Sequence, residues 1–176
     1  GKQGGAIAIE LLSRGYDVVY LHSNNINSIP GAKNFSFNTS KELYDLMCKV
    51  AEDSKYIFMV AAVSDFIIQK KPGKISRSNG GINLELTQNF DLIKEFKIKF
   101  PKVTTIAFSA QTSNDDNFQK INSKNSDYLV INNILKHKFG SDRNQVKILD
   151  RSNVLLKTED ESKNNIAIKV IDSVID

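Results

Sequence analysis

Two small residues and a carboxylate close the most apolar segment of the chain. Residues 56–63 form the strongest predicted buried strand, and Ala61 and Ala62 lie near its end, shortly before Asp65. Small side chains let a flat ligand approach the backbone, and Asp65 could accept hydrogen bonds from a sugar hydroxyl or a base amino group. Asp65 could instead only cap a turn, but its place at the end of a strand favours binding.

The chain opens on glycines that run into a predicted helix. Gly1 and Gly4 belong to the segment Gly-Lys-Gln-Gly-Gly, and the helix extends to Gly15. Free backbone N–H groups and the helix dipole would favour an anion such as phosphate there, although the glycines could serve packing alone. His22 and Ser23 follow the next strand, where dinucleotide-binding proteins carry an acidic residue, so a dinucleotide site is disfavoured.

Three lysines and one aromatic ring are further candidates. Lys74 lies in a basic loop and could close over a polyphosphate. Lys120 and Lys124 are four residues apart on a predicted helix and therefore share a face. Phe108, at the end of a strand, could stack on a base or belong to the core. Each lysine could also be an ordinary solvated surface residue.

Metal and thiol chemistry lack partners in the sequence. His22 and His137 have no obvious co-ligands, and Cys48 lies in the middle of a predicted helix without a neighbouring His. A single cysteine cannot form an intramolecular disulfide, which indicates a reducing compartment. We therefore expect a cytoplasmic protein with neither a zinc site nor a thiol nucleophile.

Composition limits the class of protein. The 176 residues are 40% hydrophobic and 25% charged, which excludes wholesale disorder, and no apolar run is long enough to cross a membrane. The formal net charge of +4 is mild and the basic residues are scattered. This pattern suits an anionic small ligand, so we expect neither nucleic acid nor a membrane as a partner.

Strands and helices alternate along the chain. Besides 56–63, strands are predicted at 17–21, 34–37, 82–86, 103–108 and 127–131; helices are predicted at 4–14, 40–51, 91–100, 118–125 and 160–175. Residues 145–150 and 153–157 read as a terminal hairpin. We therefore predict one α/β domain with a Rossmann-like, doubly wound, mostly parallel sheet, helices on both faces and a C-terminal hairpin. Ligands bind such sheets beyond the carboxyl ends of the strands.

In order and spacing, these segments resemble the phosphopantothenoylcysteine synthetase family of coenzyme A biosynthesis. The motifs that carry the resemblance are Gly-Lys-Gln-Gly at 1–4, Ala-Ala-Val-Ser-Asp-Phe at 61–66, Lys-Ile-Ser-Arg at 74–77, Gln-Asn-Phe-Asp at 88–91, Phe-Ser-Ala-Gln-Thr at 108–112, the lysines at 120 and 124, Asp-Tyr-Leu-Val-Ile-Asn at 127–132 and Phe-Gly-Ser-Asp-Arg-Asn at 139–144.

The resemblance implies a two-step ligase. A nucleoside triphosphate with Mg²⁺ would activate 4′-phosphopantothenate as an acyl nucleotidylate, and the amine of cysteine would then attack it. By the resemblance, Lys74 is the catalytic flap lysine, Asn132 binds substrate, and the partner protomer of a homodimer completes each site. The implied nucleotide-binding residues are Gly1, Gly4, Ala61, Ala62, Asp65, Lys74, Asn89, Phe90, Asp91, Phe108, Lys120 and Lys124.

The departures from the family pattern leave open questions. The Asn-Phe-Asp turn and the 139–142 loop resemble the bacterial branch of the family, which uses CTP. Ser-Asp-Phe at 64–66 and the 78–81 stretch also resemble the eukaryotic branch, which uses ATP. The family's first strand, its N-terminal turn and an Asn tied to turnover of the intermediate have no counterpart in residues 1–176, so we expect weak nucleotide binding or incomplete turnover from these residues alone.

The alternatives to the ligase function are an NAD(P)-dependent oxidoreductase and a non-catalytic nucleotide-binding module.

Overall fold

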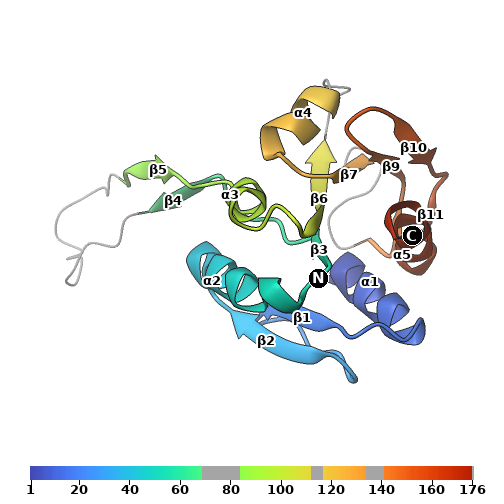
Figure 1. Ribbon diagram of the computed structural model, residues 1–176, viewed down its shortest axis with the longest axis horizontal. Helices are drawn as coiled ribbons and strands as arrows, with labels where there is room; N and C mark the ends of the chain where they lie inside the picture. Colours follow the sequence, from blue (N-terminus) through green and yellow to red (C-terminus); the bar gives the residue numbers. More distant parts are fainter. Residues whose placement is uncertain (69–83, 112–116, 134–140, 176) are drawn as a thin grey trace.

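A computed structural model describes residues 1–68, 84–111, 117–133 and 141–175 (Figure 1). Its helices are α1 (Lys2–Ser13), α2 (Ser40–Val50), α3 (Leu92–Lys99), α4 (Asn117–Lys124) and α5 (Lys163–Val174), with a short 3₁₀ turn, η1 (Ala51–Asp53). The strands are β1 (Val19–Ser23), β2 (Lys33–Phe37), β3 (Tyr56–Met59), β4 (Phe66–Ile68), β5 (Leu86–Gln88), β6 (Thr104–Gln111), β7 (Tyr128–Asn133), β8 (Arg143–Asn144), β9 (Val146–Leu149), β10 (Val154–Lys157) and β11 (Glu161–Ser162).

Capping residues set the ends of the first two helices as their sequence predicts. The hydroxyl of Thr39 accepts the N–H of Glu42 at 3.1 Å and so caps α2. At the end of α1, Gly15 has φ +84°, and the N–H groups of Gly15 and Tyr16 reach the carbonyls of Leu12 and Leu11. This is the Schellman arrangement, in which the residue after the C-cap takes a left-handed backbone conformation. Glycine is favoured at that position because it has no Cβ.

The main sheet is mixed, so the prediction of a mostly parallel sheet is wrong. Its order is β10-β9-β7-β6-β3. Strands β3, β6 and β7 are parallel, whereas β9 is antiparallel to β7 and β10 is antiparallel to β9. The predicted C-terminal hairpin is confirmed as β9 and β10, but it adds both strands to the sheet beside β7. Strands β1 and β2 form a separate parallel pair.

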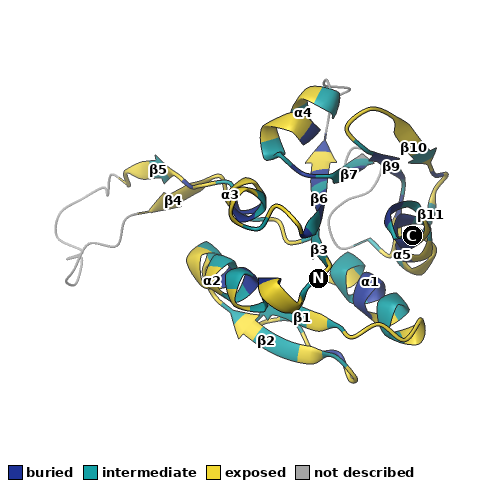
Figure 2. Ribbon diagram, in the orientation of Figure 1, coloured by how far each residue is buried: buried dark blue, intermediate teal, exposed yellow. Residues whose placement is uncertain are grey.

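Helices lie on both faces of the sheet, as predicted, and the strands between them are largely buried (Figure 2). Side chains along each buried strand alternate between two cores, so each face of the sheet is apolar. Ala107 and Leu129 face the core beneath α2, α3 and α4. Ile106 and Val130 face the opposite core, against α5. Helix α1 packs on α5 through a third cluster that includes Ile7 and Ile171. The parallel strands therefore lie between two helical layers, which leaves their ends as the accessible edges of the sheet.

A two-stranded arm leaves this body. Strand β4 pairs antiparallel with β5, joining Ile68 to Leu86, and the pair projects away from the helices in Figure 1. The arm is apolar yet exposed: Phe66, Ile67, Ile68, Leu84 and Leu86 are 42–58% accessible. A two-stranded ribbon is only marginally stable in water unless its apolar side chains are buried against something else. In this chain the apolar side chains of the arm are exposed, so the described residues do not supply that burial.

Candidate functional site

The parallel strands end together at one side of the sheet, here called the carboxyl edge. Residues 60–65 follow β3, residues 109–111 end β6, and Asn132 lies near the end of β7, paired with Ala110 and Val146. Helix α1 begins at the same edge. A Cβ placed on Gly4 would lie 3.7 Å from Cβ of Val60, so the first turn of α1 packs against the chain that leaves β3. The structure thus brings Gly1–Gly4, the segment after β3 and Asn132 to one edge.

The turn at Asn89–Asp91 is tied to the segment after β3. The buried Asn89 donates its backbone N–H to the carbonyl of Asp65 at 2.8 Å and its side-chain amide to the carbonyl of Ser64 at 2.9 Å. Asp91 then caps α3, because its Oδ1 accepts the N–H groups of Ile93 and Lys94, both at 3.2 Å. These bonds fix the position of the turn relative to Ser64 and Asp65.

The two lysines of α4 have different surroundings. Nζ of Lys124 lies 3.0 Å from Oδ2 of Asp91, and both side chains are partly buried. Lys120, one turn earlier and also half-buried, has no ion-pair partner among the described residues. The same holds for the carboxylate of Asp65, which is exposed and without a hydrogen-bond partner in the described part of the chain. Lys120 and Asp65 are therefore available to a ligand.

A second polar cluster surrounds the start of α1. Nζ of Lys2 lies 2.6 Å from Oδ1 of Asp142, the side chain of Gln3 donates to the carbonyl of Lys163 at 3.1 Å, and the N–H of Lys163 donates to the carbonyl of Asp142 at 3.0 Å. The hydrogen bond from Lys2 lowers the pKa of Asp142. Partial burial, and then the charge of Lys2, lower the pKa of Lys163.

This cluster suits an anion. The start of the 12-residue helix α1 brings its positive end near the charges of Lys2 and Lys163, and among the described residues the carboxylate of Asp142 interacts with both lysines. Sequence reasoning did not select Lys2, Asp142 or Lys163 as site residues. Lys2 and Asp142 are 140 positions apart, so no local spacing signals the pair, although both lie in motifs of the family pattern.

The aromatic candidates lie apart from each other. Phe108 is half-buried and packs with the α5 and α1 cores, on the opposite face of the sheet from α3. Phe90 is 41% exposed beside the 89–91 turn, and its ring meets Tyr44 edge-on with centroids 5.3 Å apart. The structure therefore does not bring Phe108 together with the 89–91 turn. Ala61 and Ala62 are exposed at the edge, as a backbone-approaching ligand needs. Lys74 lies outside the described residues.

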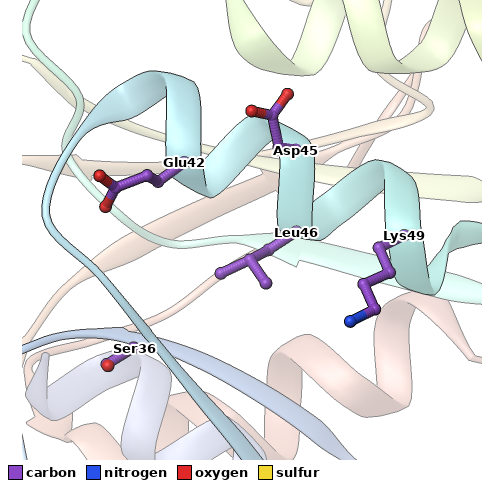
Figure 3. Close-up of a pocket in the computed structure, with 5 residues that line it drawn as sticks. All are labelled: Ser36, Glu42, Asp45, Leu46 and Lys49. Carbon is purple, nitrogen blue, oxygen red and sulfur yellow. The ribbon is translucent and has the colours of Figure 1, made fainter.

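A shallow pocket of about 340 Å³ lies elsewhere, between β2 and α2 (Figure 3). It is lined by Ser36 from β2 and by Glu42, Asp45, Leu46 and Lys49 from α2. None of the residues predicted to bind nucleotide lines it. Two of its charged side chains already have partners at or near α2: Glu42 accepts the N–H of Asn38, and Asp45 pairs with Lys41. We therefore place the candidate site at the carboxyl edge and not in this pocket.

Metal ligands do not gather among the described residues. That part of the chain holds no group of three or more His, Cys, Asp or Glu side chains that could bind a metal ion. It also contains no helix that is both long and apolar enough to span a bilayer.

One family model matches the whole chain. A model of the DNA/pantothenate metabolism flavoprotein C-terminal domain matches residues 1–176. The coenzyme A biosynthesis bifunctional protein CoaBC of Methanocaldococcus jannaschii is 26% identical over 180 residues, which cover 99% of this chain and 44% of that protein. The chain thus spans less than half of this relative.

Solved structures share the fold. The DNA/pantothenate metabolism flavoprotein from Streptococcus pneumoniae superposes with a TM-score of 0.81 at 17% identity, covering 98% of this chain and 86% of that one. A mutant of Cab2 in complex with phosphopantothenate-cysteine superposes with a TM-score of 0.71 at 15% identity, covering 98% of this chain and 77% of that one.

Proposed function

The chain belongs to the family of the DNA/pantothenate metabolism flavoprotein C-terminal domain, and we propose that it ligates 4′-phosphopantothenate to cysteine. The observation that carries the proposal is the family match over residues 1–176, joined to a relative named as a coenzyme A biosynthesis protein. A solved structure of the same fold holds phosphopantothenate-cysteine, which is the product of this ligation. The relatives do not favour the nicotinamide-dependent oxidoreductase.

The proposed reaction has two steps. A carboxylate oxygen of 4′-phosphopantothenate attacks the α-phosphorus of a nucleoside triphosphate, and pyrophosphate leaves with the electrons of the broken P–O bond. The amine of cysteine then attacks the acyl carbon, loses a proton, and displaces the nucleoside monophosphate. Both steps need charge neutralisation and close alignment and neither needs a protein nucleophile, which agrees with a site that offers lysines and helix N-termini.

The carboxyl edge supplies groups for each part of this reaction. We propose that the start of α1, with Lys2 and Lys163, holds phosphate groups, because it is a cationic cluster at a helix N-terminus. Asp65, which has no partner in the described part of the chain, would bind the sugar or base, and Lys120 would neutralise phosphate. The nucleotide would enter as its Mg²⁺ complex, with CTP preferred to ATP. Lys74 remains the proposed flap lysine.

The exposed arm supports the proposed homodimer. Apolar side chains occupy β4 and β5 on both sides of the ribbon, and a second copy of the arm offers a matching apolar surface of the same kind. The arm leads directly into Asp65 and the 89–91 turn, so an interface there would lie beside the site. In such a homodimer, the candidate sites of both protomers would lie next to the shared interface.

An arm variant tests the dimer. Ile68→Glu should convert a dimer to a monomer in size-exclusion chromatography with light scattering, because it puts a charge on the exposed apolar ribbon. Ile98→Glu is the matched control, since Ile98 is also exposed, at 59%, but lies on α3. A wild-type monomer, or an Ile68→Glu protein that stays dimeric, would contradict this interface.

Product formation and nucleotide titration test the function. The protein is incubated with 4′-phosphopantothenate, cysteine, Mg²⁺ and either CTP or ATP, and 4′-phosphopantothenoylcysteine is measured by mass spectrometry. Calorimetric titration with CTP, ATP and NADH runs in parallel. We expect product with at least one triphosphate when residues 1–176 are preceded by the family's N-terminal strand and turn, which the resemblance ties to turnover. Nucleotide binding without product would indicate a non-catalytic module, and a preference for NADH would reject the ligase.

A further inference from the structure

We propose that Asp91 is a positioning residue, which holds the ammonium group of Lys124 for the nucleotide and does not itself bind the nucleotide. This inference rests on the proposed function and divides the work of the site among its charged residues. The resemblance groups Asp91 with the nucleotide-binding residues, whereas its contacts in the structure give it a different task.

The carboxylate of Asp91 is already occupied by donors from two helices. Its Oδ1 accepts the N–H groups of Ile93 and Lys94 in the first turn of α3, and its Oδ2 accepts Nζ of Lys124 at the end of α4. Three donors from different directions fix the side chain, which is 36% exposed. A ligand that took Oδ2 as its acceptor would have to compete with an ammonium group at 3.0 Å.

Capping alone does not explain a carboxylate at this position. Asn and Ser cap a helix about as well as Asp, because one oxygen atom is enough to accept the free N–H groups. What Asp adds is a negative charge on the second oxygen, and here that oxygen faces Lys124. The charge therefore serves the lysine, and the cap is the anchor that keeps the carboxylate in place.

The neighbouring lysine shows what the pairing accomplishes. Lys120 and Lys124 lie four residues apart on α4, where two like charges repel. Asp91 pairs with Lys124 through one oxygen, while Lys120 has no ion-pair partner among the described residues. An ammonium group has three N–H donors, so Lys124 keeps donors for a ligand. Asp91 thus offsets the repulsion between the two lysines and lets both stay on one face of α4 for an anionic ligand.

The same turn sets where Lys124 sits in the site. Asn89, which precedes Asp91 by two residues, donates hydrogen bonds to the carbonyls of Ser64 and Asp65. A continuous set of hydrogen bonds therefore runs from the segment after β3, through Asn89 and Asp91, to Lys124. This connection places the ammonium group of Lys124 relative to the carboxylate proposed to bind the sugar or base.

A double-mutant cycle tests the proposal, with MgCTP and MgATP as the titrants. Asp91→Asn keeps the cap and removes the charge, and Lys124→Met keeps the apolar stem and removes the ammonium group. We expect Asp91→Asn alone to weaken nucleotide binding about fivefold, the size of effect typical of a partly buried ion pair. In the Lys124→Met background, Asp91→Asn should have no further effect on Kd.

Controls separate positioning from stability. Asp45→Asn breaks the exposed Lys41–Asp45 pair on α2 and should leave Kd unchanged, and Lys124→Arg should retain most of the wild-type affinity. If Asp91→Asn weakens binding equally with and without Lys124, Asp91 contacts the nucleotide directly and the proposal fails. A lower unfolding temperature with unchanged Kd would also overturn it. A wild-type protein that binds neither nucleotide would refute the proposed function itself.

Discussion

The two edges of the main sheet use the same kinds of charged residue in opposite ways. At the amino edge, where β6 and β7 begin, Lys97 is only 12% exposed and donates to the carbonyls of Pro101 and Val103 and to Oδ2 of Asp127, at 2.7–3.0 Å. Asp127 also accepts the N–H and hydroxyl of Thr105. At the carboxyl edge, Asp65 and Lys120 have no such partners in the described part of the chain.

The difference separates groups that hold the fold from groups that are left for a ligand. All three donors of the Lys97 ammonium group have acceptors, so its burial is compensated and its charge is not available. The lysines and carboxylates of the carboxyl edge are more exposed, with Lys2 and Asp142 at 54% and 84%. Surface pairs of this kind add little stability, and we propose that the groups at the carboxyl edge serve binding instead.

The largest expected effect is on the amino edge. Lys97→Met should lower the free energy of unfolding by about 2–4 kcal/mol, because it leaves Asp127 partly buried beside one distant arginine, with Arg151 at 3.9 Å. Urea unfolding measures the change, and nucleotide affinity below the transition should stay the same. Lys94→Met, an exposed position on the same helix, is the control. A loss below about 0.5 kcal/mol would show that the amino edge does not stabilise the fold.

A smaller and opposite pattern is expected at the carboxyl edge. Lys120→Met should weaken MgCTP binding about tenfold, the loss expected for one charge-assisted contact, and should leave the free energy of unfolding unchanged. Calorimetric titration and urea unfolding on the same sample give both values. Lys41→Met, on the exposed surface of α2, is the matched control. Destabilisation without loss of affinity would reverse the comparison between the two edges.

The smallest effect is a pH dependence at the amino edge, in the turn between β9 and β10. Backbone N–H groups of Ser152 and then Asn153 lower the pKa of the Asp150 carboxyl. The pKa of an aspartate in the unfolded chain is about 3.9, so the Asp150 carboxylate contributes its full stabilisation of the fold above that pH. The contribution disappears as the pH falls through the lower pKa that Asp150 has in the folded state.

Asp150→Asn measures this contribution. The wild type should exceed the variant by at most about 0.5 kcal/mol in the free energy of unfolding at pH 7, because the carboxylate is partly exposed. The difference should shrink as the pH falls below about 3.9. Asp53→Asn, on an exposed part of η1, gives the baseline. A difference that stays constant down to pH 3 would assign the effect to packing and not to charge.

Local signals in the sequence predicted much of the fold. The cap at Thr39, the left-handed Gly15 and the segment that became α3 depend on neighbouring residues, and each is confirmed. The strand predicted at 56–63 ends at Met59, because β3 pairs with β6 only as far as Ala107. Hairpin patterning likewise predicted β9 and β10, but it carries no information on which strand lies beside them, so the mixed sheet was missed.

The candidate site was only partly predictable for the same reason. Residues 61–65 were selected as candidates because they follow a buried strand, which is a local signal in the sequence, although the strand itself ends at Met59. Asp91 and Lys124 are 33 positions apart, and Lys2 and Asp142 are 140 apart, so only the packing of α3, α4 and α1 reveals these pairs. The family resemblance named Asp91 and Lys124 together but did not say that they bind each other.

Pyrophosphate release tests the central claim, that the carboxyl edge is the site of a two-step ligation. The protein, with the family's N-terminal strand and turn joined ahead of Gly1, is mixed with MgCTP and 4′-phosphopantothenate, with and without cysteine. Pyrophosphate is followed over time, and MgATP is the parallel sample. The account predicts a burst of about one pyrophosphate per active site without cysteine and continuous release with it. A folded, nucleotide-binding protein that releases no pyrophosphate from either triphosphate would contradict it.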